Sequence, residues 1–190
     1  YYGNRNRSMI AAMTHALAGV SRMRVGYFTI NPTPPRGNVT MYDMSDPASK
    51  ATLYATMRNL NASGNTPTRT ATAYMVKQFS RTDGGAPVML QCQKNAGMLF
   101  TDGYTNETNN GSGVLSVGDS DYSMPPPYGG GVPSSNTIAD YAMYGYLNNL
   151  RPDLPVGRVL VPDECKTGTA APGTDCNANL HMNFYGVTLG

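Results

Sequence analysis

Asp102 is the residue whose type and position most favour a chemical role. A short apolar run of residues 97–100 ends in the corner Thr101-Asp102-Gly103, the pattern of a buried parallel strand that carries a carboxylate to the edge of an α/β sheet. Ligands of open α/β folds bind beyond the carboxyl ends of the strands, so we expect Asp102 at a binding site. The alternative is a structural turn, because Asp and Gly are ordinary turn residues.

Thr66 is the second candidate, directly before Pro67 and the helical pattern of residues 68–79. A threonine at this position can cap the helix through its hydroxyl, and capping threonines are much commoner than metal-binding ones. From the residues alone, we therefore interpret Thr66 as a helix cap.

Two further acids, Asp119 and Asp121, have the spacing to chelate calcium. They lack the rest of an EF-hand loop, so we interpret them as solvated side chains of a loop.

The three cysteines cannot all pair within the chain. Cys165 and Cys176 flank a loop that contains Gly and Pro, so we expect them to form a disulfide in an oxidising compartment. Cys92 would then be a buried thiol or the partner of a cysteine outside the chain. A bond between Cys92 and Cys176 is the rival pairing.

Motifs of known catalytic chemistry are missing from the sequence. It has no Gly-x-Ser-x-Gly elbow, no phosphate-binding Gly-rich loop and no His-Glu-x-x-His. The cysteines lack zinc spacing, and the two histidines complete no metal motif. We expect a protein that is not an enzyme.

Helices and strands must position these residues. Asp46-Pro47 predicts a capped helix start, and Thr137 with Asp140 predicts a capping box. The short link between residues 24–30 and 38–42 permits an antiparallel hairpin but no crossover helix. The expected helices cover residues 8–19, with Ser8 as the cap, 47–60, 68–79 and 137–150; the expected strands cover residues 24–30, 38–42, 98–101 and 183–189. The last helix should be largely buried, because Met143, Tyr146, Leu147 and Leu150 form one apolar face and Ile138, Ala142 and Gly145 make the adjoining face apolar too.

Composition limits the classes of protein to which the chain can belong. The 190 residues suit one domain, and a net charge of +2 with 14% charged residues gives no electrostatic case for nucleic acid. No apolar run approaches the roughly 20 residues that cross a bilayer, so we expect no membrane insertion. The many Gly, Pro, Tyr, Asn, Ser and Thr residues favour an exported, loop-rich protein.

Two long segments, residues 104–135 and 151–181, lack periodicity and read as insertions. We expect the first to face a partner, because it begins where the Asp102 strand ends and contains exposed aromatic and amide side chains. We expect replacement of residues 114–132 by a short Gly-Ser linker to leave thermal stability nearly unchanged while impairing adhesion or pilus display in cells. A solvated linker is the alternative. The partner-facing candidates are Tyr104, Asn106, Tyr122 and Tyr128.

Several motifs taken together indicate a family. They are Gly64-Asn65-Thr66-Pro67-Thr68-Arg69, Cys92-Gln93-Lys94-Asn95, residues 99–106 (LFTDGYTN), 137–143 (TIADYAM), 150–154 (LRPDL), 175–182 (DCNANLHM) and 185–190 (YGVTLG). With these motifs the chain resembles the von Willebrand factor A region of the PilC/PilY family of type IV pilus tip-associated adhesins.

The resemblance implies an α/β fold over residues 1–190, a Rossmann-like, mostly parallel sheet flanked by helices. It also implies export through the periplasm to the cell surface and a place at the pilus tip, in adhesion, pilus assembly and twitching motility. In A domains a divalent ion, usually Mg²⁺, can occupy a metal-ion-dependent adhesion site. Its ligands come from an Asp-x-Ser-x-Ser loop, a threonine matched by Thr66 and an aspartate matched by Asp102, so the resemblance favours ligation by Thr66.

The chain departs from the family pattern in one respect. No Asp-x-Ser-x-Ser sequence occurs in it, so we expect that loop and the first, central strand upstream of Tyr1, and we expect the chain to be a piece of a longer protein. Residues 25–30 and 98–101 would then lack the strand that lies between them. Two ligands leave most of an octahedral Mg²⁺ shell to water, so we expect this piece to bind Mg²⁺ weakly or not at all.

Two function classes follow from the resemblance. The first is a metal-dependent adhesion module that takes a carboxylate from a host or surface ligand. The second is a structural module that joins the tip protein to minor pilins or other pilus proteins, transmits force, and uses Thr66 and Asp102 only as cap and turn.

Overall fold

The computed structural model describes residues 5–32, 35, 37–101, 103–124 and 133–188. Helices and strands alternate along this part of the chain, which is therefore of mixed α/β class, as expected from the sequence. The elements are α1 (Arg5–Ala16), β1 (Arg24–Gly26), β2 (Met41–Asp43), α2 (Pro47–Arg58), α3 (Thr68–Phe79), β3 (Ala96–Thr101), α4 (Ile138–Leu147), α5 (Asp163–Thr167) and β4 (Asn183–Thr188).

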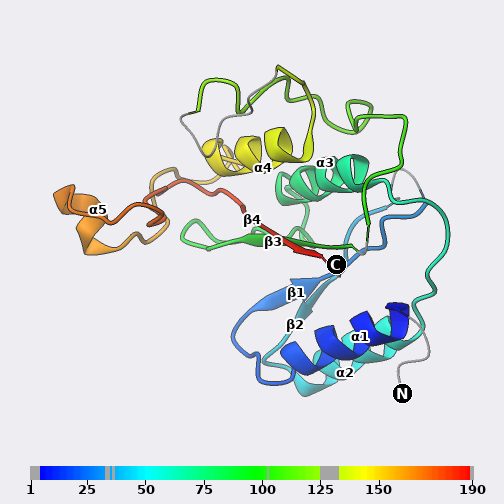
Figure 1. Cartoon of the computed structure of the whole chain (residues 1–190). Coiled ribbons are helices and arrows are strands. Elements are labelled where there is room, and N and C mark those ends of the chain that lie inside the picture. Colours follow the sequence, from blue (N-terminus) through cyan, green and yellow to red (C-terminus); the bar gives the residue numbers. More distant parts are fainter. Residues whose placement is uncertain (1–4, 33–34, 36, 102, 125–132, 189–190) are drawn as a thin grey trace.

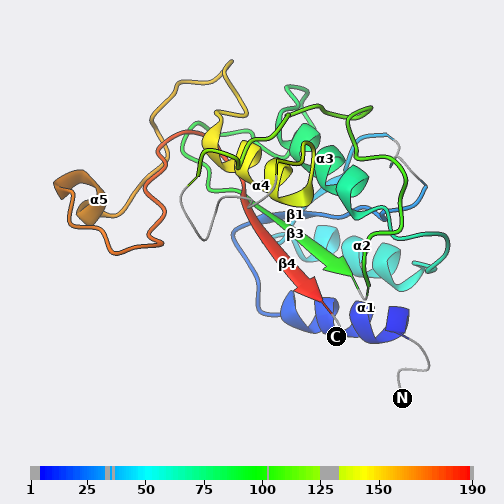
Figure 2. The ribbon, with the colours of Figure 1, turned by 45° about the horizontal axis from the view of Figure 1, so that its top comes forward.

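The strands form two separate two-stranded sheets among the described residues (Figures 1 and 2). β1 and β2 are antiparallel, with Arg24 opposite Asp43, which confirms the predicted hairpin. β3 and β4 are parallel over six residues each, from Ala96 opposite Asn183 to Thr101 opposite Thr188. The expected mostly parallel sheet is therefore limited, in the part of the chain described, to this one parallel pair.

β1 is shorter than the strand expected over residues 24–30. It ends at Gly26, and the residues that follow form hydrogen bonds with a different segment of the chain. The Asn31 side chain donates hydrogen bonds to the carbonyl oxygens of Ser63 and Asn65, at 2.9 and 2.7 Å. Residues 27–32 therefore run toward the loop before α3 instead of continuing the ladder with β2.

Two helices begin where the sequence predicts. Asp46 caps α2, and its carboxylate accepts from the backbone N–H groups of Ala48 and Ser49. α3 covers the predicted residues 68–79. α1 instead spans Arg5–Ala16, so Ser8 lies inside the helix and is not its cap.

α4 is buried on only part of the surface that the sequence assigned to the core. Tyr141 and Gly145 are buried, whereas Leu147 is 46% exposed. The N–H of Met182 donates to the carbonyl of Gly145 at 2.8 Å, so the chain leading into β4 approaches the helix at its glycine. Of the two apolar faces expected to be buried, the one with Gly145 lies in the core, and Leu150 from the other is buried as well; Leu147 is the expected core residue that is exposed instead.

The core consists of three clusters. α3, α4 and the β3–β4 sheet enclose the first, around Ala73, Met75, Val76, Tyr141, Leu150 and Met182. α1, α2 and the β1–β2 hairpin enclose the second, around Met44, Leu53 and Met57. A third joins Val88, Val159 and Leu180. In Figure 1, α3 and α4 lie on one side of the β3–β4 sheet, and α1 and α2 lie beside the hairpin.

Gly97 is required where α3 and β3 meet. A Cβ atom at this position would overlap the Sδ atoms of Met75 and Met182. The absence of a side chain lets α3 pack close to the parallel pair.

Candidate functional site

Two loops meet at the carboxyl ends of the parallel strands. The Thr66 N–H donates to Oδ1 of Asn106 at 2.5 Å, and the Asn106 N–H donates to the Thr66 carbonyl at 3.3 Å. The structure therefore brings the loop of Thr66 against the loop that follows β3. Asp102, the other candidate ligand, lies outside the described residues.

Glu107, which the sequence did not single out, caps α3. Its carboxylate accepts from the Arg69 N–H at 2.5 Å, the Thr70 N–H at 3.1 Å and the Thr70 hydroxyl at 2.5 Å. Its side chain is only 4% exposed. A buried carboxylate at a helix N-terminus satisfies donors that have no partner within the helix and interacts favourably with the helix dipole.

Thr66 is therefore not the cap expected from the residues alone. The N-cap residue of α3 is Pro67, and no side chain at that position caps the helix. The two oxygens of a carboxylate reach three donors, which one threonine hydroxyl cannot do. Glu107 lies 38 residues after Arg69, so no local sequence pattern marks this contact.

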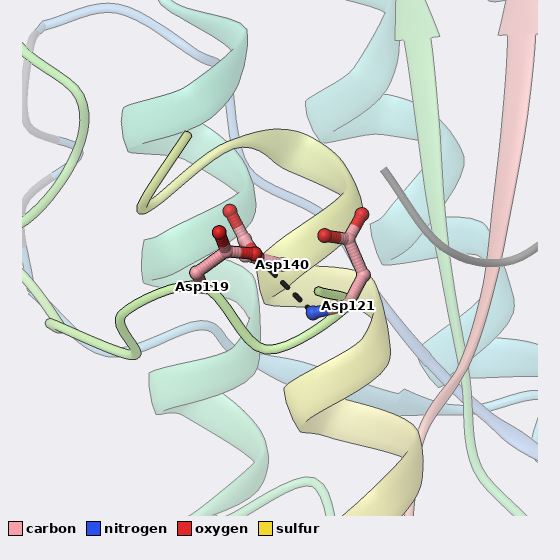
Figure 3. A group of neighbouring side chains, drawn as sticks. All are labelled: Asp119, Asp121 and Asp140. Carbon is pink, nitrogen blue, oxygen red and sulfur yellow. Dashed lines mark hydrogen bonds between the residues drawn. The ribbon is translucent and has the colours of Figure 1, made fainter. Parts of the chain in front are cut away.

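An acidic cluster lies on the same long segment and at the start of α4 (Figure 3). Asp119, Asp121 and Asp140 each offer a carboxylate oxygen within 4.8 Å of the others. Asp121 is 6% exposed and Asp140 is fully buried. The expectation that Asp121 is a solvated loop acid is therefore wrong, because the loop folds back and places it against α4.

Asp140 holds this arrangement together. The predicted capping box is present: one Asp140 oxygen accepts from the N–H and the hydroxyl of Thr137, both at 2.8 Å. Its other oxygen accepts from the N–H groups of Ser120 at 2.6 Å and Asp121 at 3.3 Å. Four donors thus converge on one buried carboxylate, so Asp140 caps the helix and anchors the loop at once.

The cluster could hold a divalent metal ion. Its donors are all carboxylate oxygens, which suit a hard cation such as Ca²⁺ or Mg²⁺. Because the four hydrogen bonds occupy the lone pairs of Asp140, Asp119 and Asp121 are the better-placed ligands, and Asp140 would contribute mainly its charge.

The long first segment is partly built into the core. Val114, Leu115 and Val117 pack against the cluster around Tyr141. The Tyr141 hydroxyl donates toward the carbonyls of Asn110 and Leu115, at 2.8 and 2.9 Å. Burial raises the pKa of this phenol to about 12, and the nearby carboxylates of Asp140 and Glu107 add to the effect.

This packing corrects the expectation that residues 114–132 could be removed at almost no cost in stability, because their loss would expose the apolar face that residues 114–117 cover. Of the partner-facing candidates, Tyr104 is 99% and Tyr122 is 62% exposed. Asn106 is bonded to Thr66, and Tyr128 lies outside the described residues.

The second long segment carries the predicted disulfide. Cys165 and Cys176 are bonded, with their Cα atoms 5.4 Å apart. Cys92 is free and exposed, which excludes both the rival pairing and the buried thiol that the sequence allowed.

His181, the last residue of this segment, is 2% exposed. Its Nδ1 is 2.7 Å from the Asn179 carbonyl oxygen and its Nε2 is 3.0 Å from Oδ2 of Asp175. Both partners accept hydrogen bonds, so both bonds form when the ring carries two protons. Burial opposes ionisation of Asp175, but the hydrogen bonds from Asn183, Asn177 and His181 outweigh it, and its pKa lies below the ordinary value.

Comparisons of the chain with protein-family models, with curated proteins and with solved structures return no match. Within the described ranges, none of the helices combines the length and the apolar character that crossing a membrane requires.

Proposed function

We propose that the chain is a non-enzymatic adhesion module of an exported surface protein, built like the von Willebrand factor A region of the PilC/PilY pilus-tip adhesins. The observation that supports this most is the contact between the Thr66 loop and the loop after β3. The Thr66 N–H and Oδ1 of Asn106 are 2.5 Å apart, and β3 runs parallel to β4 with its carboxyl end at these loops. Ligands of α/β proteins bind at such an edge.

In this proposal Thr66 and Asp102 bind a divalent cation, Mg²⁺ in the first instance. No hydrogen bond occupies the Thr66 hydroxyl among the described residues, which leaves its lone pairs to a cation. The remaining ligands would come from groups outside the chain and from water. An ion held in this way keeps an open position for the carboxylate of a host or surface ligand.

The test measures metal-dependent adhesion by cells that display the full-length protein. Thr66→Ala should reduce Mg²⁺-dependent attachment at least tenfold and leave piliation unchanged. Thr52→Ala is the matched control, since Thr52 is an exposed threonine of α2. Attachment that persists in Thr66→Ala cells, or that is insensitive to EDTA, would refute the metal-dependent adhesion module.

Calorimetry on the isolated chain separates the two candidate cation sites. We expect weak binding of Mg²⁺ or Ca²⁺ that is lost in Asp119→Asn and unchanged in Thr66→Ala, because Thr66 and Asp102 alone supply too few ligands. Tight binding that Asp102→Ala abolishes would show that the chain already holds a complete site at the strand ends.

A second candidate function is a force-transmitting joint to minor pilins. It is supported by Met98 and Tyr185, which lie opposite one another on one face of the β3–β4 sheet and are 48% and 52% exposed. In that case Met98→Lys with Tyr185→Lys would abolish display of pili, whereas Thr66→Ala would leave both display and attachment intact.

A further inference from the structure

Charge is divided unevenly along the chain. Residues 1–82 contain ten Lys and Arg against two Asp and Glu, whereas residues 83–190 contain four against ten. The overall charge of +2 is therefore the sum of a basic first part, at +8, and an acidic second part, at −6. Such an asymmetry within one chain favours an electrostatic partner for the basic part.

The helices α1 and α2 lie side by side in the basic part and run in opposite directions (Figure 1). Asn6, near the start of α1, donates to the Leu60 carbonyl just beyond the end of α2, at 2.8 Å. At the other end, the Lys50 ammonium of α2 donates to the Ala18 and Val20 carbonyls that follow α1, at 2.7 and 2.9 Å. The first turn of α1 therefore lies beside the last turn of α2.

Three arginines are found where these two turns meet, and we call them the arginine patch. Arg5 and Arg7 belong to the first turn of α1, Arg58 is the last residue of α2, and all three are exposed. The sequence has no Asp or Glu over residues 1–42 or 47–82. The segments that form and surround this end of the two helices thus supply cations without carboxylates to offset them.

The residue type of the patch suits carboxylate ligands. A guanidinium carries five N–H donors in a planar fork that matches the two oxygens of a carboxylate, so a contact within the chain still leaves donors for a ligand. Arginine is also enriched at protein–protein interfaces, where lysine is depleted. All three cations of the patch are arginines, which favours a protein partner.

The surroundings of the patch select among anionic partners. A long polyanion such as a nucleic acid would extend past three cations onto a chain whose residues 83–190 carry a net charge of −6. Among the described residues of α1 and α2, no large apolar side chain is exposed, so the patch lacks the anchor that holds a helix in a lipid surface. A short acidic segment meets neither obstacle.

We propose that the arginine patch binds an acidic protein segment, in which neighbouring Asp and Glu residues present several carboxylates together. The patch lies at the start of the segment that leads from Leu60 to Thr66. It uses neither Thr66, Asp102 nor a bound cation, so this interaction goes beyond the proposed metal-dependent adhesion.

The experiment is fluorescence anisotropy with a labelled oligo-glutamate peptide, on the chain in EDTA. We expect binding that weakens roughly threefold when NaCl is raised from about 20 to about 150 mM, and no binding of an oligo-glutamine peptide. Absence of oligo-glutamate binding at the lower salt concentration, or equal binding of oligo-glutamine, would overturn the proposal. Because EDTA removes divalent ions, failure here is distinct from failure of metal-dependent adhesion.

Two double variants locate the site. Arg7→Gln with Arg58→Gln removes two charges from the patch, and the affinity for oligo-glutamate should fall by about tenfold. Lys94→Gln with Arg158→Gln removes the same charge at exposed residues of the acidic part and should leave the affinity within about twofold of the parent. Since all four side chains are exposed, both variants should unfold at the parent's temperature. Unchanged binding in the first variant, or an equal loss in both, would refute the patch as the site.

Other anions test the class of partner. A short DNA duplex and vesicles that contain anionic phospholipid should each bind more weakly than oligo-glutamate. Tighter binding of the duplex or the vesicles that is lost in Arg7→Gln with Arg58→Gln would assign the patch to a nucleic acid or a membrane, and would overturn the acidic protein segment.

Discussion

The two long irregular segments of the chain are ordered by different kinds of contact. The first, residues 104–135 and described over 104–124 and 133–135, is held by the carboxylates of Glu107 and Asp140, which accept hydrogen bonds from backbone N–H groups at helix N-termini and in the loop. The second, residues 151–181, is held by a disulfide and by the Asp175–His181 pair.

The two segments differ in the contacts that hold them in place. The first segment shares its anchors with α3 and α4, so loop and helices support one another, and its apolar residues join the main core. The second contributes Val159 and Leu180 to the third core cluster, but its disulfide between Cys165 and Cys176 closes only a local loop, and α5 projects away from the sheet in both views (Figures 1 and 2). We therefore expect loss of an anchor to destabilise the whole fold in the first segment and mainly the local loop in the second.

The largest effect is expected from Asp140→Asn. The amide keeps the shape of the side chain but replaces one acceptor oxygen with a donor that faces backbone N–H groups. With four donors on one buried carboxylate, we expect a loss of about 3 kcal/mol in the free energy of unfolding. Urea denaturation measures it, and Asp119→Asn, at a partly exposed acid of the same cluster, should cost less than about 1 kcal/mol. Equal costs would mean that the anchor role is misassigned.

The second-largest effect is expected from Glu107→Gln. The free energy of unfolding should fall by about 2 kcal/mol, because the α3 cap loses its charge and one acceptor. Glu164→Gln, at an exposed glutamate of α5, is the matched control and should change stability little. A Glu107→Gln protein as stable as the parent would show that the helix is capped by other groups.

Reduction of the disulfide should lower the free energy of unfolding by a comparable amount and loosen the folded loop as well. Closing a loop whose ends are 11 residues apart restricts the unfolded chain by about 2 to 3 kcal/mol in the entropic model. Hydrogen exchange should speed up more in residues 163–178, where reduction also frees the folded loop, than in α3, which is affected only through global unfolding. Before reduction, intact-mass analysis should find one free thiol, at Cys92; an equal increase of exchange in α3 would contradict the separation of the two segments.

The smallest effect is a pH shift at Asp175. Since its folded-state pKa is below the ordinary value of 3.8, its contribution to stability is complete above that value and is lost as the pH falls through the lowered pKa. The Asn177 N–H, which donates to Asp175 Oδ1 at 3.2 Å, should report a titration midpoint below 3.8 by NMR. His181→Gln should raise the midpoint, and a midpoint above 3.8 in the parent protein would be inconsistent with the described hydrogen bonds.

Features that depend on neighbours in the sequence were accessible without the structure. Asp46 before Pro47 and Thr137 with Asp140 identify helix starts, because a cap and the N–H groups that it satisfies are at most three residues apart. The apolar run that ends at Thr101 identified a strand, and the short loop between Cys165 and Cys176 identified the disulfide.

Features that depend on distant contacts were decided only by the tertiary structure. Glu107 caps a helix that begins 39 residues earlier at Thr68, and Asp121 joins Asp140 only because the loop folds back over α4. The division into two sheets and the burial of His181 are of the same kind. A sequence specifies local hydrogen-bond partners through the spacing of residues. The partner of a buried carboxylate on a loop depends instead on where that loop lies once the core has packed.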